Sequence, residues 1–387
     1  MENSRKGWAF AVMAGTLVAV AGPAFADLAV TANDSHSVNV NGVTGPPKNA
    51  PPDTVSIIDV SAYPPKLVAT VETPTSVVGP PLSIAIARDE SYAIVTAATK
   101  IDPLNPEKIV PDNRVAVIDL KASPPKVVQQ ATAGDGAAGV SISPDGTLAL
   151  VANRTEGTVS VFAIKDKHLE PVQKIDLGNA KASPSAVVFL PDGKTALLTR
   201  DGDNMISVLH IDSAKATVDQ RPVTAGLRPY MLDINHDGSM AVTGDMGRGD
   251  GDVDTVSLID LKQKPFQTVE TASVGHTPEG LKFSPDGKFL AVATVEGSTK
   301  AHDSWLFHDH GTLTVYAVEG AKLRKLAQAP IGRWSQGVAF SKDGKTVLVG
   351  SMIDHGINVF RWEDGKLTAG PTVDVKSGPA AIRTAWP

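Results

Sequence analysis

Apolar and polar residues alternate with a period of two along most of the chain. The segment "GVSIS" at 139–143 puts Val140 and Ile142 on one side and three small residues on the other, which is typical of a β-strand. The turn "SPDG" follows it, with Pro setting φ at the first corner and Gly supplying a positive φ. "TLALVAN", "GTVSVFAI" and "VQKIDL" then read as three more strands. The pattern predicts an all-β unit of four strands.

This unit recurs. Asp-Gly turns place Asp145, Asp192, Asp237, Asp286 and Asp343 at intervals of 47, 45, 49 and 57 residues, and the degenerate copy "AIARDESYAIVTA" puts Asp89 56 residues before the first of them. Periods of about 40 to 50 residues are typical of propeller blades. We interpret the aspartates as turn residues, because hairpin geometry fixes their position.

The two ends of the chain complete one unit. The N-terminal piece starts mid-unit and supplies three strands, whereas "SGPAAIRTAW" near the C-terminus matches a first strand with nothing after it. A shared blade of this kind closes the ring and removes open sheet edges; a stack of β-sandwiches would not need it. We predict a single seven-bladed β-propeller over residues 27–387, with blades at 27–74 plus 377–387, 80–132, 135–178, 182–224, 228–273, 276–329 and 333–375.

Residues 1–26 have the pattern of an export signal. Arg5 and Lys6 precede an apolar run of about 16 residues, shorter than the roughly 20 that a membrane helix needs, and Ala24 and Ala26 fit a signal-peptidase site. We predict cleavage after Ala26, a periplasmic or secreted protein, and no membrane insertion after cleavage. The segment carries one acidic and two basic residues, so the formal charge changes from −6 to −7.

Composition excludes several functions. The chain has no cysteine, which rules out disulfides, thiolate metal sites and c-type haem attachment. The acidic balance argues against nucleic acid as a partner, since phosphate binding needs a basic face.

The repeats resemble a known family. "SPDGTLALVANRTEGTVSVFAI" and "SPDGKFLAVATVEG" are similar to YVTN-type seven-bladed propellers, whose fold is shared with lactonase-family propellers, and the resemblance covers essentially the whole chain after residue 26. The tetrapeptide itself is degenerate here ("LVAN", "IVTA", "AVAT"). The resemblance favours a non-catalytic binding or scaffold protein that presents one face to a small ligand, a metal or a protein partner. No motif allows lactonase catalytic residues to be carried over.

Candidate chemistry lies on one face of the propeller. Loops between second and third strands, and between each fourth strand and the next blade, emerge together on what we call the loop face, where ligand sites of such folds are expected. Its candidate general base and partner are His276 and Glu279, and Arg228 and Arg333 are candidates for polarising a carbonyl. The candidate ligand-binding residues are Tyr230, Arg333, Trp334 and Gln336.

The stretch "HDSWLFHDH" is the candidate metal site. With the nearby "DHG", it offers His302, Asp303, His308, His310, Asp354 and His355, and His with Asp suits a divalent ion such as zinc, manganese or iron. The alternative is a solvated loop whose Trp305, Leu306 and Phe307 pack on a neighbouring loop. "DGDVD" at 250–254 lacks the glycine and distal glutamate of a calcium-binding EF-hand loop.

Three functions remain open. The first is the binding propeller, which a plugged channel and a broad exposed patch would favour. The second is a lactonase-like hydrolase, which predicts that polar groups from different blades converge at the channel mouth, with Arg228 or Arg333 pointing inward. The third is the cofactor-free propeller subunit of a periplasmic dehydrogenase. The fold alone does not choose among them.

Overall fold

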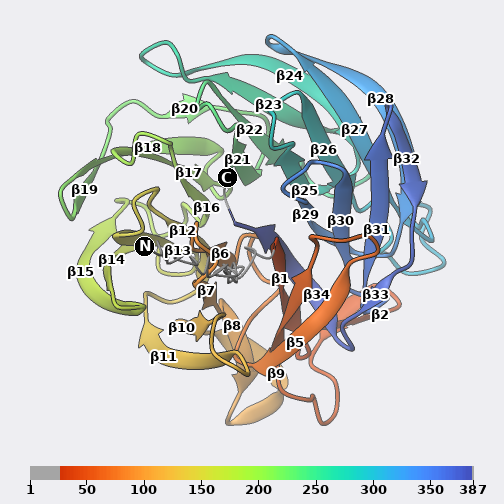
Figure 1. The fold of residues 1–387 in the computed structure, drawn as a ribbon, viewed down its shortest axis with the longest axis horizontal. Coiled ribbons are helices and arrows are strands. Elements are labelled where there is room, and N and C mark those ends of the chain that lie inside the picture. The colour runs from red at the N-terminus through yellow and green to blue at the C-terminus, as the bar shows by residue number, and fades with distance from the viewer. Residues whose placement is uncertain (1–26, 386–387) are drawn as a thin grey trace, which may run out of the picture.

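The computed structural model describes residues 27–385 and shows seven four-stranded antiparallel sheets arranged around a central axis (Figure 1). The all-β seven-bladed propeller predicted from the repeats is confirmed. The predicted signal peptide lies outside the described residues. Within the part described, no helix is long and apolar enough to cross a membrane.

In blades 2 to 7 the strands follow chain order from the axis outward, and in blade 1 the C-terminal strand is innermost. Their strands are β34 (Gly378–Thr384), β1 (Leu28–Asp34), β4 (Thr54–Asp59) and β5 (Lys66–Glu72) in blade 1; β6 (Ile84–Ile86), β7 (Tyr92–Thr96), β10 (Arg114–Asp119) and β11 (Lys126–Thr132) in blade 2; β12 (Ala137–Ile142), β13 (Leu148–Asn153), β14 (Thr158–Lys165) and β15 (His168–Asp176) in blade 3; and β16 (Pro184–Phe189), β17 (Thr195–Arg200), β18 (Met205–Asp212) and β19 (Lys215–Val218), with β20 (Val223–Thr224), in blade 4.

The remaining blades are built in the same way. Their strands are β21 (Pro229–Ile234), β22 (Met240–Asp245), β23 (Asp254–Asp260) and β24 (Gln267–Gly275) in blade 5; β25 (Pro278–Phe283), β26 (Phe289–Thr294), β27 (Gly311–Glu319) and β28 (Lys322–Ile331) in blade 6; and β29 (Ser335–Phe340), β30 (Thr346–Ser351), β31 (Gly356–Glu363) and β32 (Lys366–Ala369), with β33 (Val373–Asp374), in blade 7. Two hairpins are inserted, β2 (Val38–Val40) with β3 (Val43–Gly45), and β8 (Thr99–Asp102) with β9 (Asn105–Pro111).

The C-terminal strand closes the ring. β34 pairs antiparallel with β1, from Ala29 opposite Thr384 to Asp34 opposite Gly378, so blade 1 combines three N-terminal strands with one C-terminal strand, as the sequence predicts. Blade 1 is thereby a complete four-stranded sheet, and the ring of blades is closed.

The Asp-Gly turns are structural, as interpreted. Asp145 Oδ1 accepts hydrogen bonds from Ser143 Oγ at 2.6 Å and from the Thr147 amide at 3.0 Å. Asp286 and Asp343 accept the equivalent bonds. The bond from Ser143 is the main reason that the pKa of Asp145 is lowered. An aspartate whose carboxylate accepts the backbone amide two residues further on forms an Asx turn. These carboxylates therefore stabilise the hairpins and are not ligand sites.

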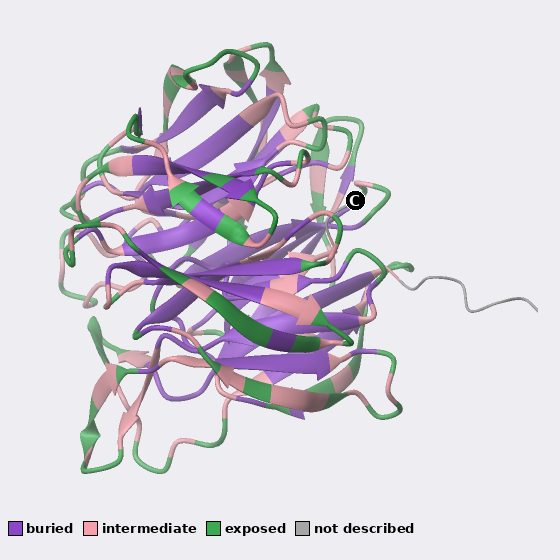
Figure 2. Cartoon of the chain, turned by 90° about the vertical axis from the view of Figure 1, so that its left-hand side faces the viewer, coloured by how far each residue is buried: buried purple, intermediate pink, exposed green. Residues whose placement is uncertain are grey.

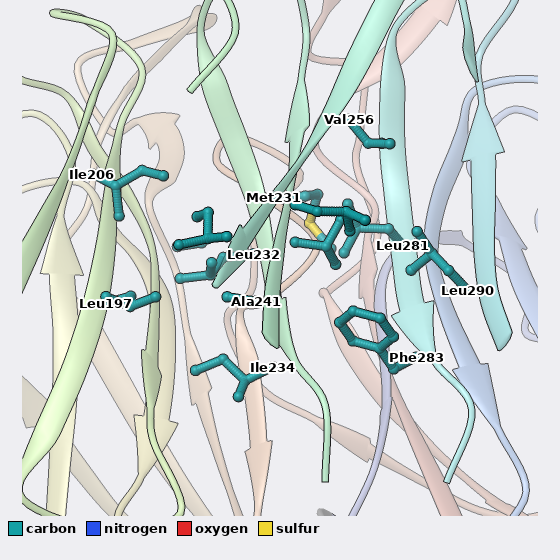
Figure 3. Close-up of a cluster of buried hydrophobic side chains, with 14 of the residues drawn as sticks. Leu197, Ile206, Met231, Leu232, Ile234, Ala241, Val256, Leu281, Phe283 and Leu290 are labelled. Carbon is teal, nitrogen blue, oxygen red and sulfur yellow. The ribbon is translucent and has the colours of Figure 1, made fainter. Parts of the chain in front are cut away.

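Apolar side chains fill the layers between blades. Figure 2 shows buried positions concentrated on the inner strands and exposed ones on edge strands and loops. The largest cluster joins blades 4, 5 and 6, where Leu197, Leu232 and Leu281 are each fully buried (Figure 3). The alternation seen in the sequence therefore serves two interfaces, because both faces of each blade meet a neighbouring blade.

Small residues on the first strands permit close packing at the axis. A Cβ built on Gly139 of β12 would lie 2.3 Å from the carbonyl oxygen of Ser185 on β16 of the next blade. That oxygen belongs to the backbone and cannot rotate away. We expect Gly139→Ala to lower the free energy of unfolding by about 1–3 kcal/mol, as overpacking does, measured by urea denaturation.

Gly45→Ala is the matched control, because a Cβ at Gly45 meets nothing within 4 Å. A surface change of this kind should stay within about 0.5 kcal/mol. If Gly139→Ala were equally harmless, the blades would have to be able to separate at the axis, contrary to the structure.

Candidate active site at the channel mouth

Blades 4 to 7 enter their first strands through the same left-handed turn. On the loop face, the residue just before the first strand has a left-handed backbone in blades 4 to 7: Ser183, Arg228, Thr277 and Trp334, with φ between 51° and 58°. The ladder then shifts register at Pro184/Val187, Pro229/Met231, Pro278/Gly280 and Gln336/Val338. Bulges of this kind change the direction of side chains and are frequent at functional sites.

The second residue after each of these left-handed positions is polar in four consecutive blades, and in blades 4 to 6 it lies within the register shift. These residues are Ser185, Tyr230, Glu279 and Gln336. A second polar position comes from the residues that directly follow the second strand, which are Arg154 after β13 and Asp201 after β17. Two repeated positions thus bring polar groups from blades 3 to 7 to one place.

The first half of the site is an ion-pair network. Arg154 binds Asp201 with both terminal nitrogens, at 2.5 and 2.8 Å. Ser185 Oγ donates to Asp201 at 2.6 Å, and Arg228 Nη2 lies 3.6 Å from the same carboxylate. The Arg154 guanidinium also stands 5.4 Å from the centre of the Tyr230 ring. The Asp201 carboxylate therefore contacts two arginines: it binds Arg154 through two hydrogen bonds and Arg228 through a longer ion pair.

Burial sharpens the electrostatics of this network. The side chain of Asp201 is 3% exposed and that of Arg154 is 19% exposed. Burial alone would raise the pKa of Asp201, but its hydrogen bond and charge interaction with Arg154 outweigh burial and leave the pKa lowered. The pair is therefore ionised at neutral pH.

Glu279 forms the second half of the site. Its carboxylate accepts a hydrogen bond from the Gln336 side-chain amide of the next blade. The surrounding protein desolvates the carboxyl and raises its pKa to about 7, while Gln336, Trp334 and Arg228 lower it in part. The residue nevertheless keeps partial contact with solvent. A carboxyl of this kind can take up and release a proton near neutral pH.

A small cavity adjoins the site at Trp334. A cavity of about 180 Å³ on the loop face is lined by Trp334, Met352, Asp34 and His355, with the β2 strand at its edge. Trp334 touches both this cavity and Glu279. A proton acceptor, guanidinium and amide donors, and an aromatic wall are what the hydrolysis of an ester requires.

The structure separates the predicted residues into two groups. Glu279, Arg228, Tyr230, Trp334 and Gln336 come together at the mouth. Arg333 and His276 do not join them. Arg333 is paired with Asp354 at 2.7 Å on the outer part of the loop face. His276 has no hydrogen bond to Glu279 among the described residues; its backbone amide contacts Glu296 at 3.4 Å and its buried Nε2 is unpartnered.

Three residues of the site are not among the predicted catalytic, ligand-binding or metal residues. Arg154 and Asp201 stand in loops that the repeats identify, and Ser185 stands in the first strand of blade 4, but no motif marks them. Aligning the blades by their strands would have marked Ser185, because it occupies the same first-strand position as Tyr230, Glu279 and Gln336. Arg154 and Asp201 share a different position, directly after the second strand.

The "HDSWLFHDH" stretch is an exposed bridge between loops. Its five His and Asp side chains are all exposed. The His302 amide donates to Asn41 Oδ1 of blade 1 at 2.9 Å, and Lys300 Nζ donates to the Gly249 carbonyl of blade 5 at 2.9 Å. Leu306 and Trp305 pack against Gly251, although Trp305 remains 82% exposed. The loop-packing alternative describes this segment best.

The predicted metal ligands are not gathered around one point. Within residues 27–385, one group of three His or acidic side chains has its ligand atoms within 4.8 Å, and it consists of Asp34, His36 and Asp53. Asp34 already accepts backbone amides from His36, Ser37 and Val77 at 2.7–2.8 Å. This carboxylate ties loops together through three backbone amides.

We expect the double variant His308→Ala/His310→Ala to change the free energy of unfolding by no more than about 0.5 kcal/mol, because both side chains are exposed. Thermal unfolding with and without added zinc measures this. A loss of zinc-dependent stabilisation in the variant would show instead that the two histidines hold an ion.

No protein-family profile matches the sequence, and no curated protein is significantly similar to it. Among solved structures, a candidate 6-phosphogluconolactonase from Bacteroides uniformis matches with a TM-score of 0.70 at 15% identity, over 94% of this chain and 100% of that one. The periplasmic gluconolactonase of Pseudomonas aeruginosa gives 0.68 at 21%, over 94% and 99%. Kuenenia stuttgartiensis hydrazine synthase gives 0.61 at 21%, over 80% and 91%. At these identities the likeness shows the fold alone, which is that of a seven-bladed propeller.

Proposed function

We propose that this protein is a lactonase-like hydrolase that opens a cyclic ester at the channel mouth of the loop face. The observation that carries the proposal is Glu279, a carboxyl with a pKa of about 7 that contacts Gln336 and lies beside Arg228. This is the convergence of polar groups from several blades, with Arg228 at the mouth, that distinguishes a catalytic propeller from a scaffold.

The groups suit each part of ester hydrolysis. Glu279 takes a proton from water as the water oxygen attacks the lactone carbonyl carbon. The carbonyl oxygen becomes negative, and Arg228 with the Gln336 amide stabilises that charge. The ring C–O bond then breaks, the leaving oxygen receives the proton from Glu279, and a hydroxy acid results. Arg154 and Asp201 fix the position of Arg228 through the shared carboxylate.

Two further observations support the proposal. One structurally similar protein is a periplasmic gluconolactonase, and the apolar N-terminal segment of this chain fits export to the same compartment. We therefore propose that the protein works in the periplasm on a polar lactone.

The test is a proton-release assay with the purified protein and D-glucono-1,5-lactone, followed with a pH indicator against the spontaneous rate in the same buffer. γ-Butyrolactone and a linear ester are assayed in parallel. We expect catalysis of a lactone in excess of the linear ester. Tight binding of the lactone or its hydroxy acid by calorimetry, without turnover of any lactone, would instead establish the binding propeller.

A further inference from the structure

A large cavity lies at the opposite mouth of the channel. It measures about 610 Å³ and lies on the face of the Asp-Gly turns, where it touches blades 1, 2, 5, 6 and 7. Much of its wall is apolar, formed by Ile234, Phe283, Pro285, Phe340 and Ala385. It has the size and lining of a small-molecule site, and the proposed hydrolase does not use it.

Charged groups stand at its inner end. Lys282 of β25 lines the cavity, and its Nζ donates to Asp233 of β21 at 2.9 Å. An adjoining cavity of about 50 Å³ is lined by Asp233 and Arg383 and shares Thr384 with the large one. Two cations from blades 6 and 1 thus face one carboxylate from blade 5 inside the channel.

One negative charge faces two positive charges here. Asp233, with 1% of its side chain exposed, also accepts the Phe283 backbone amide at 2.9 Å. The hydrogen bonds between described residues leave the Arg383 guanidinium without a hydrogen-bond acceptor, and Asp233 is the opposite charge that acts on it. Burial lowers the pKa of both Lys282 and Arg383. The two cations together carry one more charge than Asp233 neutralises, and a bound anion would balance that charge.

The acids at the rim do not supply that anion. Asp27 accepts the Lys342 backbone amide and Glu90 accepts the Leu28 amide at 3.0 Å, so both are fixed to the chain. Asp89 accepts the Ser91 amide in its turn. Burial raises the pKa of Asp27 and Glu90. Arg88 and Lys342 add further positive charge to the rim.

We propose that this cavity binds a carboxylate that carries an apolar body. The carboxylate reaches Arg383 and Lys282 at the inner end, and the apolar body lies against Phe283 and Phe340. A guanidinium favours a carboxylate because its two parallel donors match the two oxygens. This site is independent of the lactonase proposal, since it lies at the other mouth of the channel.

The test is calorimetric titration of the full chain with octanoate, with octanamide and acetate as partners that lack the charge or the apolar body. We expect octanoate to bind at least tenfold more tightly than either. Equal affinity for octanamide would overturn the role of the two cations, and equal affinity for acetate would overturn the role of the apolar wall.

Two variants locate the site. Arg383→Met should weaken octanoate binding at least tenfold and raise the melting temperature of the unliganded protein, because it removes an uncompensated charge. Ala385→Trp, which fills the cavity from its rim, should weaken octanoate binding while leaving the charges in place. Arg324→Met, on the exposed outer strand of blade 6, should change neither quantity. Octanoate binding that survives both cavity variants would place the ligand elsewhere and refute the proposal.

Discussion

Replacing Glu279 with glutamine should reduce lactone hydrolysis by a factor of about 10²–10⁴, the usual contribution of a positioned acid–base group. Glutamine keeps the shape and can still accept a hydrogen bond, but it cannot take a proton from water. The loss should therefore appear in kcat and not in KM. Initial rates over a range of lactone concentrations, corrected for spontaneous hydrolysis, measure it.

The pH dependence of the hydrolysis rate tests the role of the same residue. Glu279 acts as a base only when it is deprotonated, and its pKa is raised from 4.5 to about 7. The rate should therefore rise as the pH increases through about 7 and level off above it. Glu156→Gln is the matched control on the same face, because Glu156 forms an exposed pair with Lys174 that is worth about 0–1 kcal/mol. If Glu279→Gln kept more than a tenth of kcat, Glu279 would not be the base.

The stability of the Glu279→Gln variant shows whether its activity is lost because the base is missing or because the fold is damaged. Because the pKa of Glu279 in the folded protein lies above its ordinary value, the protonated form favours folding. That contribution is present below about pH 4.5 and is lost as the pH rises through about 7. The glutamine variant stays neutral, so above pH 7 it should be at least as stable as the parent protein while being far less active.

The sequence was sufficient for the fold because the fold depends on local, repeated signals. The Asp-Gly turns at Asp145 and its equivalents fix the hairpins, and the alternation around Val140 fixes which residues face a neighbouring blade. The incomplete units at the two ends require a shared blade, and the β34–β1 pairing confirms it. Each of these signals acts over a few residues and recurs in most blades.

The site is harder to predict because its residues are far apart in sequence and none belongs to a motif. Glu279 and Gln336 are 57 residues apart, and Arg154 and Asp201 are 47 apart. The density of His and Asp at 302–310 attracted the metal prediction, yet those side chains are exposed and spread along a bridging loop. Local density of polar residues indicates solvent exposure as readily as a site. Equivalent positions in successive blades carry more information, since the ring brings them together.

Replacing Asp201 with alanine should lower the free energy of unfolding by about 3 kcal/mol at neutral pH, because it leaves Arg154 partly buried without its counter-charge. Ser185 also loses its acceptor. Chemical denaturation measures the loss. Since the folded protein lowers the pKa of Asp201 below its ordinary 3.8, the stability it contributes is present above that pH and is lost as the pH falls further. The variant and the parent should therefore converge in acid.

The double variant Arg154→Met/Asp201→Leu decides whether the loss comes from the unpaired charge. Removing both charges should recover most of the stability, as replacing a buried pair by apolar groups commonly does, and the difference from the sum of the single variants gives the coupling. Lactone hydrolysis should not recover, because Arg228 would still lack the carboxylate that lies 3.6 Å from it. A double variant as unstable as Asp201→Ala would mean that the packing and hydrogen bonds of the native side chains stabilise the blades, and that the unpaired charge does not cause the loss. Recovery of stability without activity would show that the pair of Arg154 and Asp201 is needed to place Arg228.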